Sequence, residues 1–139
     1  MRRIRSPRWL TFYQWLAGLC DVTTGLALMF APGWTLSLMG VRHVPQPVEF
    51  AAFIGAFVFS VGLAYWYAAR LPICAANAAR WQTVWWLTAL VRSVVAGFLT
   101  WKILAGSLET AWVTVAVTDG LLAIFQWTGL RAGWLDFKD

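Results

Sequence analysis

Three ionisable side chains lie inside long apolar runs of this 139-residue chain. Arg92 is close to the middle of the run 81–105, and Asp21 and Asp119 occur in two other such runs. A charged group in hydrocarbon is costly unless a group of opposite charge lies beside it, so charged groups inside a membrane usually pair and often mark a functional site. Two aspartates that share an arginine can pass a proton through their carboxyl groups, bind a ligand or hold helices in register.

Counting residues along the runs predicts that the three charges lie at one depth. Asp21, Arg92 and Asp119 are each 11 or 12 residues from one end of their run. At about 1.5 Å per helical residue, each lies roughly 17 Å into the membrane. That depth is close to the middle of a hydrocarbon core about 30 Å thick. We therefore expect the three side chains to meet.

Small and polar residues accompany each charge at helical spacing. Thr88 lies one turn before Arg92, and Gln126 lies two turns after Asp119. Such faces are typical of helix contacts, since lipid-facing surfaces carry mostly large apolar side chains. We expect Arg92 to bridge Asp21 and Asp119, with Thr88 and Gln126 beside them. Two carboxylates and one guanidinium leave a formal charge of −1, so one aspartate is expected to hold a proton. A structural cluster is the favoured interpretation, and a proton relay or ligand site is the alternative.

The composition indicates that lipid is the solvent for most of the surface. The chain is 60% hydrophobic and only 12% charged, with 11 tryptophans, whereas soluble domains contain about 25% charged residues. We predict an all-α integral membrane protein with a single domain, 1–139, folded as a four-transmembrane-helix antiparallel bundle. The predicted spans are 9–30, 49–69, 81–105 and 109–130, and 34–48 is predicted to lie at the membrane interface.

Glycines are predicted to mark where the helices touch. Gly55 and Gly62 are seven residues apart and therefore lie on one helix face, and Gly18 and Gly25 flank Asp21. Small residues at such spacing allow two helix backbones to approach closely. We expect these four glycines to serve helix packing.

Basic residues predict the orientation of the chain. The formal net charge is +5, and eight of the eleven Lys and Arg residues fall on one side of the predicted topology. The positive-inside rule then places both termini in the cytoplasm. Basic residues that flank a membrane span do not indicate nucleic-acid binding, which we exclude. The eight residues are Arg2, Arg3, Arg5, Arg8, Arg70, Arg80, Arg131 and Lys138.

Cofactor and metal chemistry finds little support in the sequence. Cys20 and Cys74 form no CxxC pair, which argues against a thiol–disulfide enzyme. His43 is the sole histidine, and a metal site needs about three or four ligands. We predict no metal site, no catalytic residues and no bound cofactor. A tetrapyrrole on His43, or a quinone against aromatic residues such as Tyr65 and Trp66, remains the alternative. Enzymatic activity stays open, although the sequence favours its absence.

The first predicted span ends with GLALMFAPGW and is followed by LMG, and the second contains Glu49, Gly55 and Gly62-Leu63. The third contains Arg92 and the fourth contains Asp119-Gly120. This pattern resembles the DoxX-like group of small four-helix membrane proteins. Some members of that group are linked to quinone-associated respiratory or sulfur oxidation complexes. The resemblance implies a bacterial inner membrane, and it implies no catalytic residues.

Three functions follow as hypotheses. Short loops and the lack of a catalytic constellation favour a non-catalytic accessory or assembly subunit. It would lie in the lipid bilayer and pack against a larger respiratory or redox complex, or against other copies of itself. The first alternative is a quinone-linked redox component. The second is a small proton-coupled carrier that uses Asp21, Arg92 and Asp119.

Overall fold

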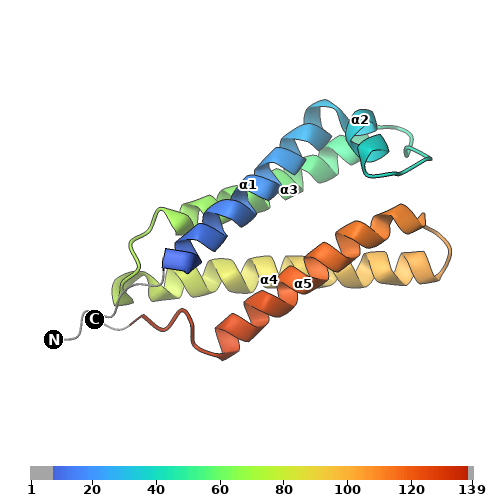
Figure 1. Ribbon diagram of the computed structural model, residues 1–139. Helices are drawn as coiled ribbons and strands as arrows, with labels where there is room; N and C mark the ends of the chain where they lie inside the picture. Colours follow the sequence, from blue (N-terminus) through green and yellow to red (C-terminus); the bar gives the residue numbers. More distant parts are fainter. Residues whose placement is uncertain (1–7, 138–139) are drawn as a thin grey trace.

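A computed structural model describes residues 8–137 of the protein, and this part of the chain is helical without strands (Figure 1). Arg2, Arg3, Arg5 and Lys138, which contribute to the predicted basic excess, lie outside the described residues. The elements are α1 (Arg8–Phe30), α2 (Pro32–Leu38), α3 (Glu49–Ala69), α4 (Ala75–Leu104), a short 3₁₀ turn η1 (Thr110–Trp112) and α5 (Val113–Arg131).

The prediction of a four-transmembrane-helix antiparallel bundle is wrong. Residues 8–137 form five α-helices, and three helical segments are long and apolar enough to cross a membrane. These segments are α3, α4 and residues 110–131. The 23-residue helix α1 is not among them. Its apolar run contains Gln14, Asp21 and three threonines, and these polar residues lower its mean hydropathy. The described chain is therefore a membrane protein with three candidate spans.

The segment predicted to lie at the interface, 34–48, contains most of the short helix α2 and the loop that leads to α3. Helix α2 is separate from α1 because Pro32 lies in its first turn. Proline has no backbone N–H and a fixed φ, so it is well suited to start a helix and cannot continue one. This helix turns the chain back toward α3.

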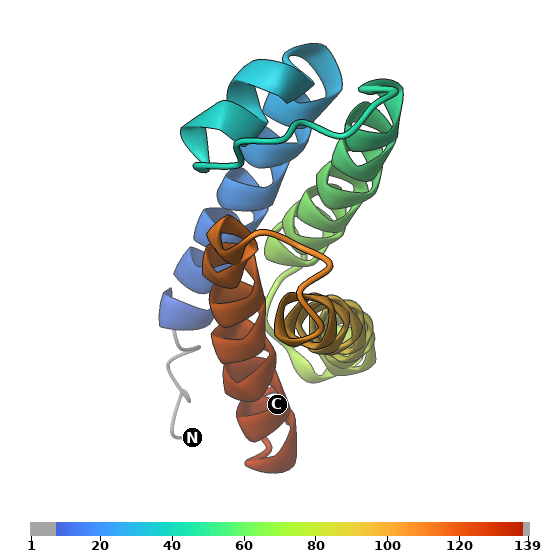
Figure 2. The same cartoon turned by 90° about the vertical axis from the view of Figure 1, so that its right-hand side faces the viewer.

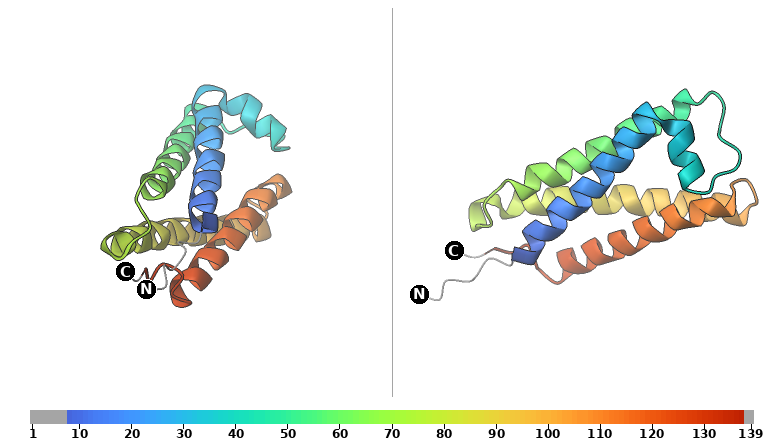
Figure 3. Two further views of the ribbon diagram at one scale, coloured as in Figure 1. Left: turned by 60° about the vertical axis from the view of Figure 1, so that its left-hand side comes forward. Right: turned by 45° about the horizontal axis from the view of Figure 1, so that its top comes forward.

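The four long helices associate as two antiparallel pairs. Helix α1 packs along α3, and α4 packs along α5 (Figures 1 and 2). Helix α1 begins, α3 ends, α4 begins and α5 ends at one end of the molecule, which we call the Arg8 end. Helix α2 and the turn before η1 lie at the other end, which we call the Glu109 end (Figures 1 and 3).

The four predicted packing glycines form the contact between α1 and α3, which we call the glycine seam (Gly18, Gly25, Gly55 and Gly62). A Cβ added at Gly25 would lie 2.5 Å from the backbone nitrogen of Phe59, and one added at Gly55 would lie 2.8 Å from the carbonyl oxygen of Gly25. The absence of side chains therefore lets the two backbones touch, which maximises dispersion contacts where lipid offers no hydrophobic driving force.

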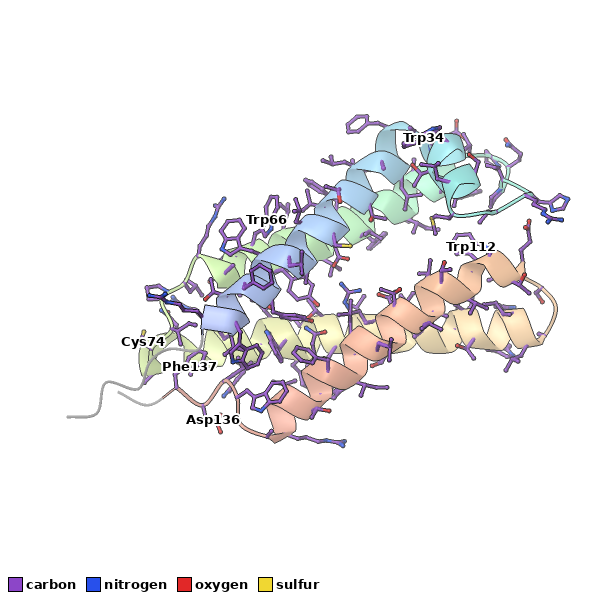
Figure 4. The ribbon with its side chains drawn as sticks, viewed as in Figure 1. Trp34, Trp66, Cys74, Trp112, Asp136 and Phe137 are labelled. Atoms are coloured by element: carbon purple, nitrogen blue, oxygen red, sulfur yellow. The ribbon has the colours of Figure 1, made fainter. Side chains whose placement is uncertain are left out.

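The Arg8 end contains an aromatic core where the two helix pairs meet. Trp81 and Trp85 of α4 are fully buried, together with Leu10 of α1 and Leu135 after α5. The ring of Phe137 packs edge-on against Trp81 with 5.9 Å between the ring centroids, and Figure 4 shows Phe137 at this end. The chain after α5 thus folds back over the start of α4 and closes this end of the molecule.

A second contact joins the two helix pairs at the Glu109 end. The Glu109 carboxylate accepts hydrogen bonds from the backbone N–H groups of Arg42 (2.9 Å) and His43 (2.7 Å), and the His43 Nδ1 lies 2.9 Å from it. Trp112 packs against the cluster that contains Leu36 of α2, and Figure 4 shows Trp112 at this end. We call the contacts of Glu109 with Arg42 and His43 the Glu109 clamp.

The Glu109 clamp is expected to weaken in acid. The backbone N–H groups of Arg42 and His43, followed by the His43 ring, hold the pKa of the Glu109 carboxyl below its ordinary value of 4.5. Because the folded protein favours the ionised form, the clamp contributes fully above that value and is lost as the pH falls through the lowered pKa. In a His43→Ala background, which removes the histidine titration, Glu109→Gln should lower the melting temperature at neutral pH. That difference should disappear in acid, and a difference that did not depend on pH would contradict the clamp.

Candidate functional site

Arg92, in the middle of α4, is bound by groups from three other helices. Its Nη2 donates to Asp21 Oδ2 on α1 (2.5 Å), its Nη1 donates to Asp119 Oδ1 on α5, and its Nε donates to the hydroxyl of Tyr65 on α3 (3.2 Å). The guanidinium carbon also lies 5.6 Å from the centroid of the Tyr65 ring. One side chain therefore connects all four long helices. We call Asp21, Tyr65, Arg92 and Asp119 the charged layer.

The structure brings together the three charges that the sequence places at one depth. The side chains of Arg92, Asp21 and Asp119 are 7%, 13% and 15% exposed, so the ion pairs are largely shielded. Desolvation of charges is expensive, and close ion pairing with good hydrogen bonds offsets the cost. The layer has two carboxylates for one guanidinium, and its formal charge is therefore −1. Its role, structural or functional, stays a prediction.

Each aspartate accepts a hydrogen bond from Arg92 through one of its two carboxylate oxygens. Among the described residues, the second oxygens, Asp21 Oδ1 and Asp119 Oδ2, have no hydrogen-bond partner, and neither is fully enclosed. A carboxylate oxygen offers two lone pairs to any donor that reaches it. The layer therefore keeps two acceptors for a proton or a small positively charged group.

Two buried amides lie on the Arg8 side of the charged layer. Gln126 of α5 donates from Nε2 to Thr88 Oγ1 (2.7 Å), which brings together the two polar residues that the sequence places beside the charges. Gln14 of α1 accepts a hydrogen bond from the Trp85 indole N–H (2.9 Å). Since Trp85 and Thr88 are one turn apart on α4, both amides reach the same stretch of that helix. We call Gln14, Trp85, Thr88 and Gln126 the amide layer.

Several buried polar atoms near these layers have no partner within residues 8–137. They include the Tyr13 hydroxyl, Gln14 Nε2 and Gln126 Oε1. A buried polar atom without a hydrogen bond costs about 1–3 kcal/mol, so such atoms usually bind water or a ligand. The ring of Tyr13 lies edge-on to that of Tyr65, with 6.2 Å between the centroids. Unused donors and acceptors thus lie close to the charged layer.

Two residues of the site, Gln14 and Tyr65, were not predicted to lie with the charges. Gln14 lies seven residues before Asp21, and this spacing puts both on one helix face. Asp119 and Gln126 have the same spacing. Polar residues seven apart in an apolar helix were thus a usable signal for Gln14. Tyr65 was considered only as an aromatic residue that could contact a flat ligand. No periodicity in α3 indicates its hydrogen bond to Arg92.

The remaining candidates lie away from the charged layer. Cys20 is exposed on α1, and Cys74 precedes α4. The His43 side chain is 90% exposed and reaches Glu109, which makes at most two ligands where a metal site needs three or four. Within residues 8–137, no group of three or more His, Cys, Asp or Glu residues comes together. One surface hollow lies along α5, and a second lies between the first turns of α4 and the residues that follow α5. No residue of the charged layer lines either hollow.

Comparison of the chain with models of protein families, with curated proteins and with solved structures found no match. The resemblance to the DoxX-like group therefore depends on the quoted residues alone and stays a prediction.

Proposed function

We propose that the protein is a non-catalytic accessory or assembly subunit of a bacterial inner membrane, where it packs against other membrane proteins. The observation that carries the proposal is that Arg92 is held by side chains of its own chain. Arg92 donates to three groups on three helices of its own chain. In this arrangement the charges of Asp21, Arg92 and Asp119 hold the two helix pairs together, which is a structural role.

Large apolar side chains on α3 support a packing role. Phe50, Phe53 and Phe57 are each more than half exposed, and they recur at three- and four-residue spacing on one face of α3. Phe53 and Phe57 stack edge-on with 4.9 Å between their ring centroids. Aromatic side chains offer large contact areas at little cost in conformational entropy, so such a face suits a neighbouring helix. We call these three residues the phenylalanine face.

Arginines at one end of the molecule support the proposed orientation. Four exposed arginines lie at the Arg8 end and form what we call the basic collar (Arg8, Arg70, Arg80 and Arg131). Among the described residues, the Glu109 end has only two basic residues, Arg42 and Lys102. Because positively charged ends of membrane proteins are retained in the cytoplasm, we propose that the Arg8 end faces the cytoplasm.

Purification in mild detergent tests the packing role. The intact protein is expected to co-purify with a defined set of membrane proteins, and the double variant Phe53→Ala/Phe57→Ala should lose them while it melts as the wild type does. Leu121→Ala is a matched control, because Leu121 is equally exposed on α5 and outside the phenylalanine face. A monomer without partners in the wild type, or equal losses in both variants, would argue against the proposal.

A small proton-coupled carrier is the second candidate. The two free carboxylate oxygens of the charged layer and the unpartnered Gln14 and Gln126 atoms favour it. Asp119→Asn removes the excess negative charge and keeps the shape of the side chain. A carrier should then lose proton flux in reconstituted vesicles and still melt as the wild type does. If flux and melting were both unaffected, the layer would not move protons. The quinone-linked role depends on the aromatic residues and on the resemblance, and no contact in residues 8–137 favours it.

A further inference from the structure

A surface hollow follows the last two turns of α5. Its lining residues are Ile124, Trp127, Thr128 and Arg131. Their spacing of three, four and seven residues from Ile124 puts them on one face of the helix. Apolar side chains thus line the part of the hollow nearer the middle of α5. The Arg131 guanidinium lies where α5 ends, at the Arg8 end. The hollow therefore has an apolar part and a cationic part, in the order in which a phospholipid presents its chain and its phosphate.

The wall of this hollow is held in place by α4. The indole N–H of Trp127 donates to Ser93 Oγ (3.0 Å). The Trp127 ring also packs edge-on against Trp86, with 6.5 Å between the ring centroids. A side chain fixed by a hydrogen bond and by a ring contact loses little further entropy when a ligand binds. The hollow is therefore formed before anything occupies it.

The charge at this end selects the kind of head group. Arg131 forms no ion pair among the described residues, and it belongs to the basic collar. The planar guanidinium matches the oxygens of a phosphate in geometry and charge. The carbonyl groups at the end of α5 carry a partial negative charge, which would repel a phosphate without Arg131. Arg131 thus decides whether an anion can bind here.

We propose that the hollow binds one anionic phospholipid. The acyl chain lies against Ile124 and Trp127, and the phosphate contacts the Arg131 guanidinium. The site is on the outer face of α5 and does not involve the phenylalanine face or the charged layer. It is therefore independent of the proposed packing function, and either can fail without the other.

Native mass spectrometry of the full chain tests the site. The protein is released from nanodiscs that contain equal amounts of phosphatidylglycerol and phosphatidylcholine, and the lipids that stay bound are counted. The wild type is expected to retain one phosphatidylglycerol in preference to phosphatidylcholine. Arg131→Gln should weaken that retention about fivefold or more, the effect of one basic residue near a membrane surface. Arg131→Lys should keep more of it than Arg131→Gln.

Arg80→Gln is the matched control. Arg80 belongs to the same basic collar, but it contacts Asn77 (3.3 Å) and does not line the hollow. Full retention in Arg80→Gln together with loss in Arg131→Gln supports the site. Equal losses in both variants would show general attraction by the collar, and unchanged retention in Arg131→Gln would show that the hollow does not hold the phosphate. Either result overturns the proposal. Melting curves of both variants verify that they are folded.

Discussion

Arg92→Leu is expected to lower the free energy of unfolding by about 3–5 kcal/mol, the usual cost of removing one partner from a buried ion pair. The substitution leaves Asp21 and Asp119 shielded from water without their cation. It also removes the N–H group that donates a hydrogen bond to the Tyr65 hydroxyl. Because Arg92 connects α4 to α1, α3 and α5, the loss should separate the two helix pairs. Unfolding in mixed micelles of increasing denaturing detergent measures the change.

Two further variants separate the charge of Arg92 from its geometry. Arg92→Lys keeps the charge but cannot donate to three groups in a fixed fork, so its cost should be intermediate. Lys102→Leu removes a cation from the last turn of the same helix, where it lies over the Trp101 ring, and should cost much less. Combining Arg92→Leu with Asp21→Asn and Asp119→Asn should restore part of the stability, since no buried charge is then left alone. Wild-type stability of Arg92→Leu alone would show that the charged layer does not hold the helices.

Gly25→Ala is expected to cost about 1–3 kcal/mol or more, because it forces atoms into a filled contact. The new Cβ would lie 2.5 Å from the backbone nitrogen of Phe59 and 2.8 Å from the carbonyl oxygen of Gly55. Backbone atoms cannot rotate away as a side chain can, so α1 and α3 must move apart. The glycine seam would then lose contacts along its length. The same unfolding assay measures the effect.

Gly97→Ala is the control for this variant. Gly97 lies within α4, and a Cβ added there would meet nothing within 4 Å. The exchange should be neutral or stabilising by up to about 1 kcal/mol, since alanine favours a helix more than glycine does. If Gly25→Ala behaved like Gly97→Ala, the backbones of α1 and α3 would not be in contact as described.

The positions of most helices can be predicted from the apolar runs. The predicted span 49–69 coincides with α3, because its apolar run is long and ends at local breakers. Helix α4 begins at Ala75, six residues before the predicted start at 81, and α5 begins at Val113 after a 3₁₀ turn. The meeting of Asp21, Arg92 and Asp119 at one level of the helices could also be predicted by counting, since the rise per helical residue is constant. The number of spans did not follow, because α1 is long enough but carries too many polar residues.

Which helix faces meet depends on the packing of helices that are far apart in the sequence. Tyr65 and Arg92 are 27 residues apart, and Gln14 and Trp85 are 71 apart. Such contacts depend on how each helix is rotated about its axis. In water the apolar stripe of a helix reveals that rotation, but a helix in lipid is apolar on nearly every side. Charges marked the inward faces of α1, α4 and α5, and Gly55 and Gly62 marked the face of α3 that meets α1. The bond between Tyr65 and Arg92 and the Glu109 clamp became visible only when the helices were packed together.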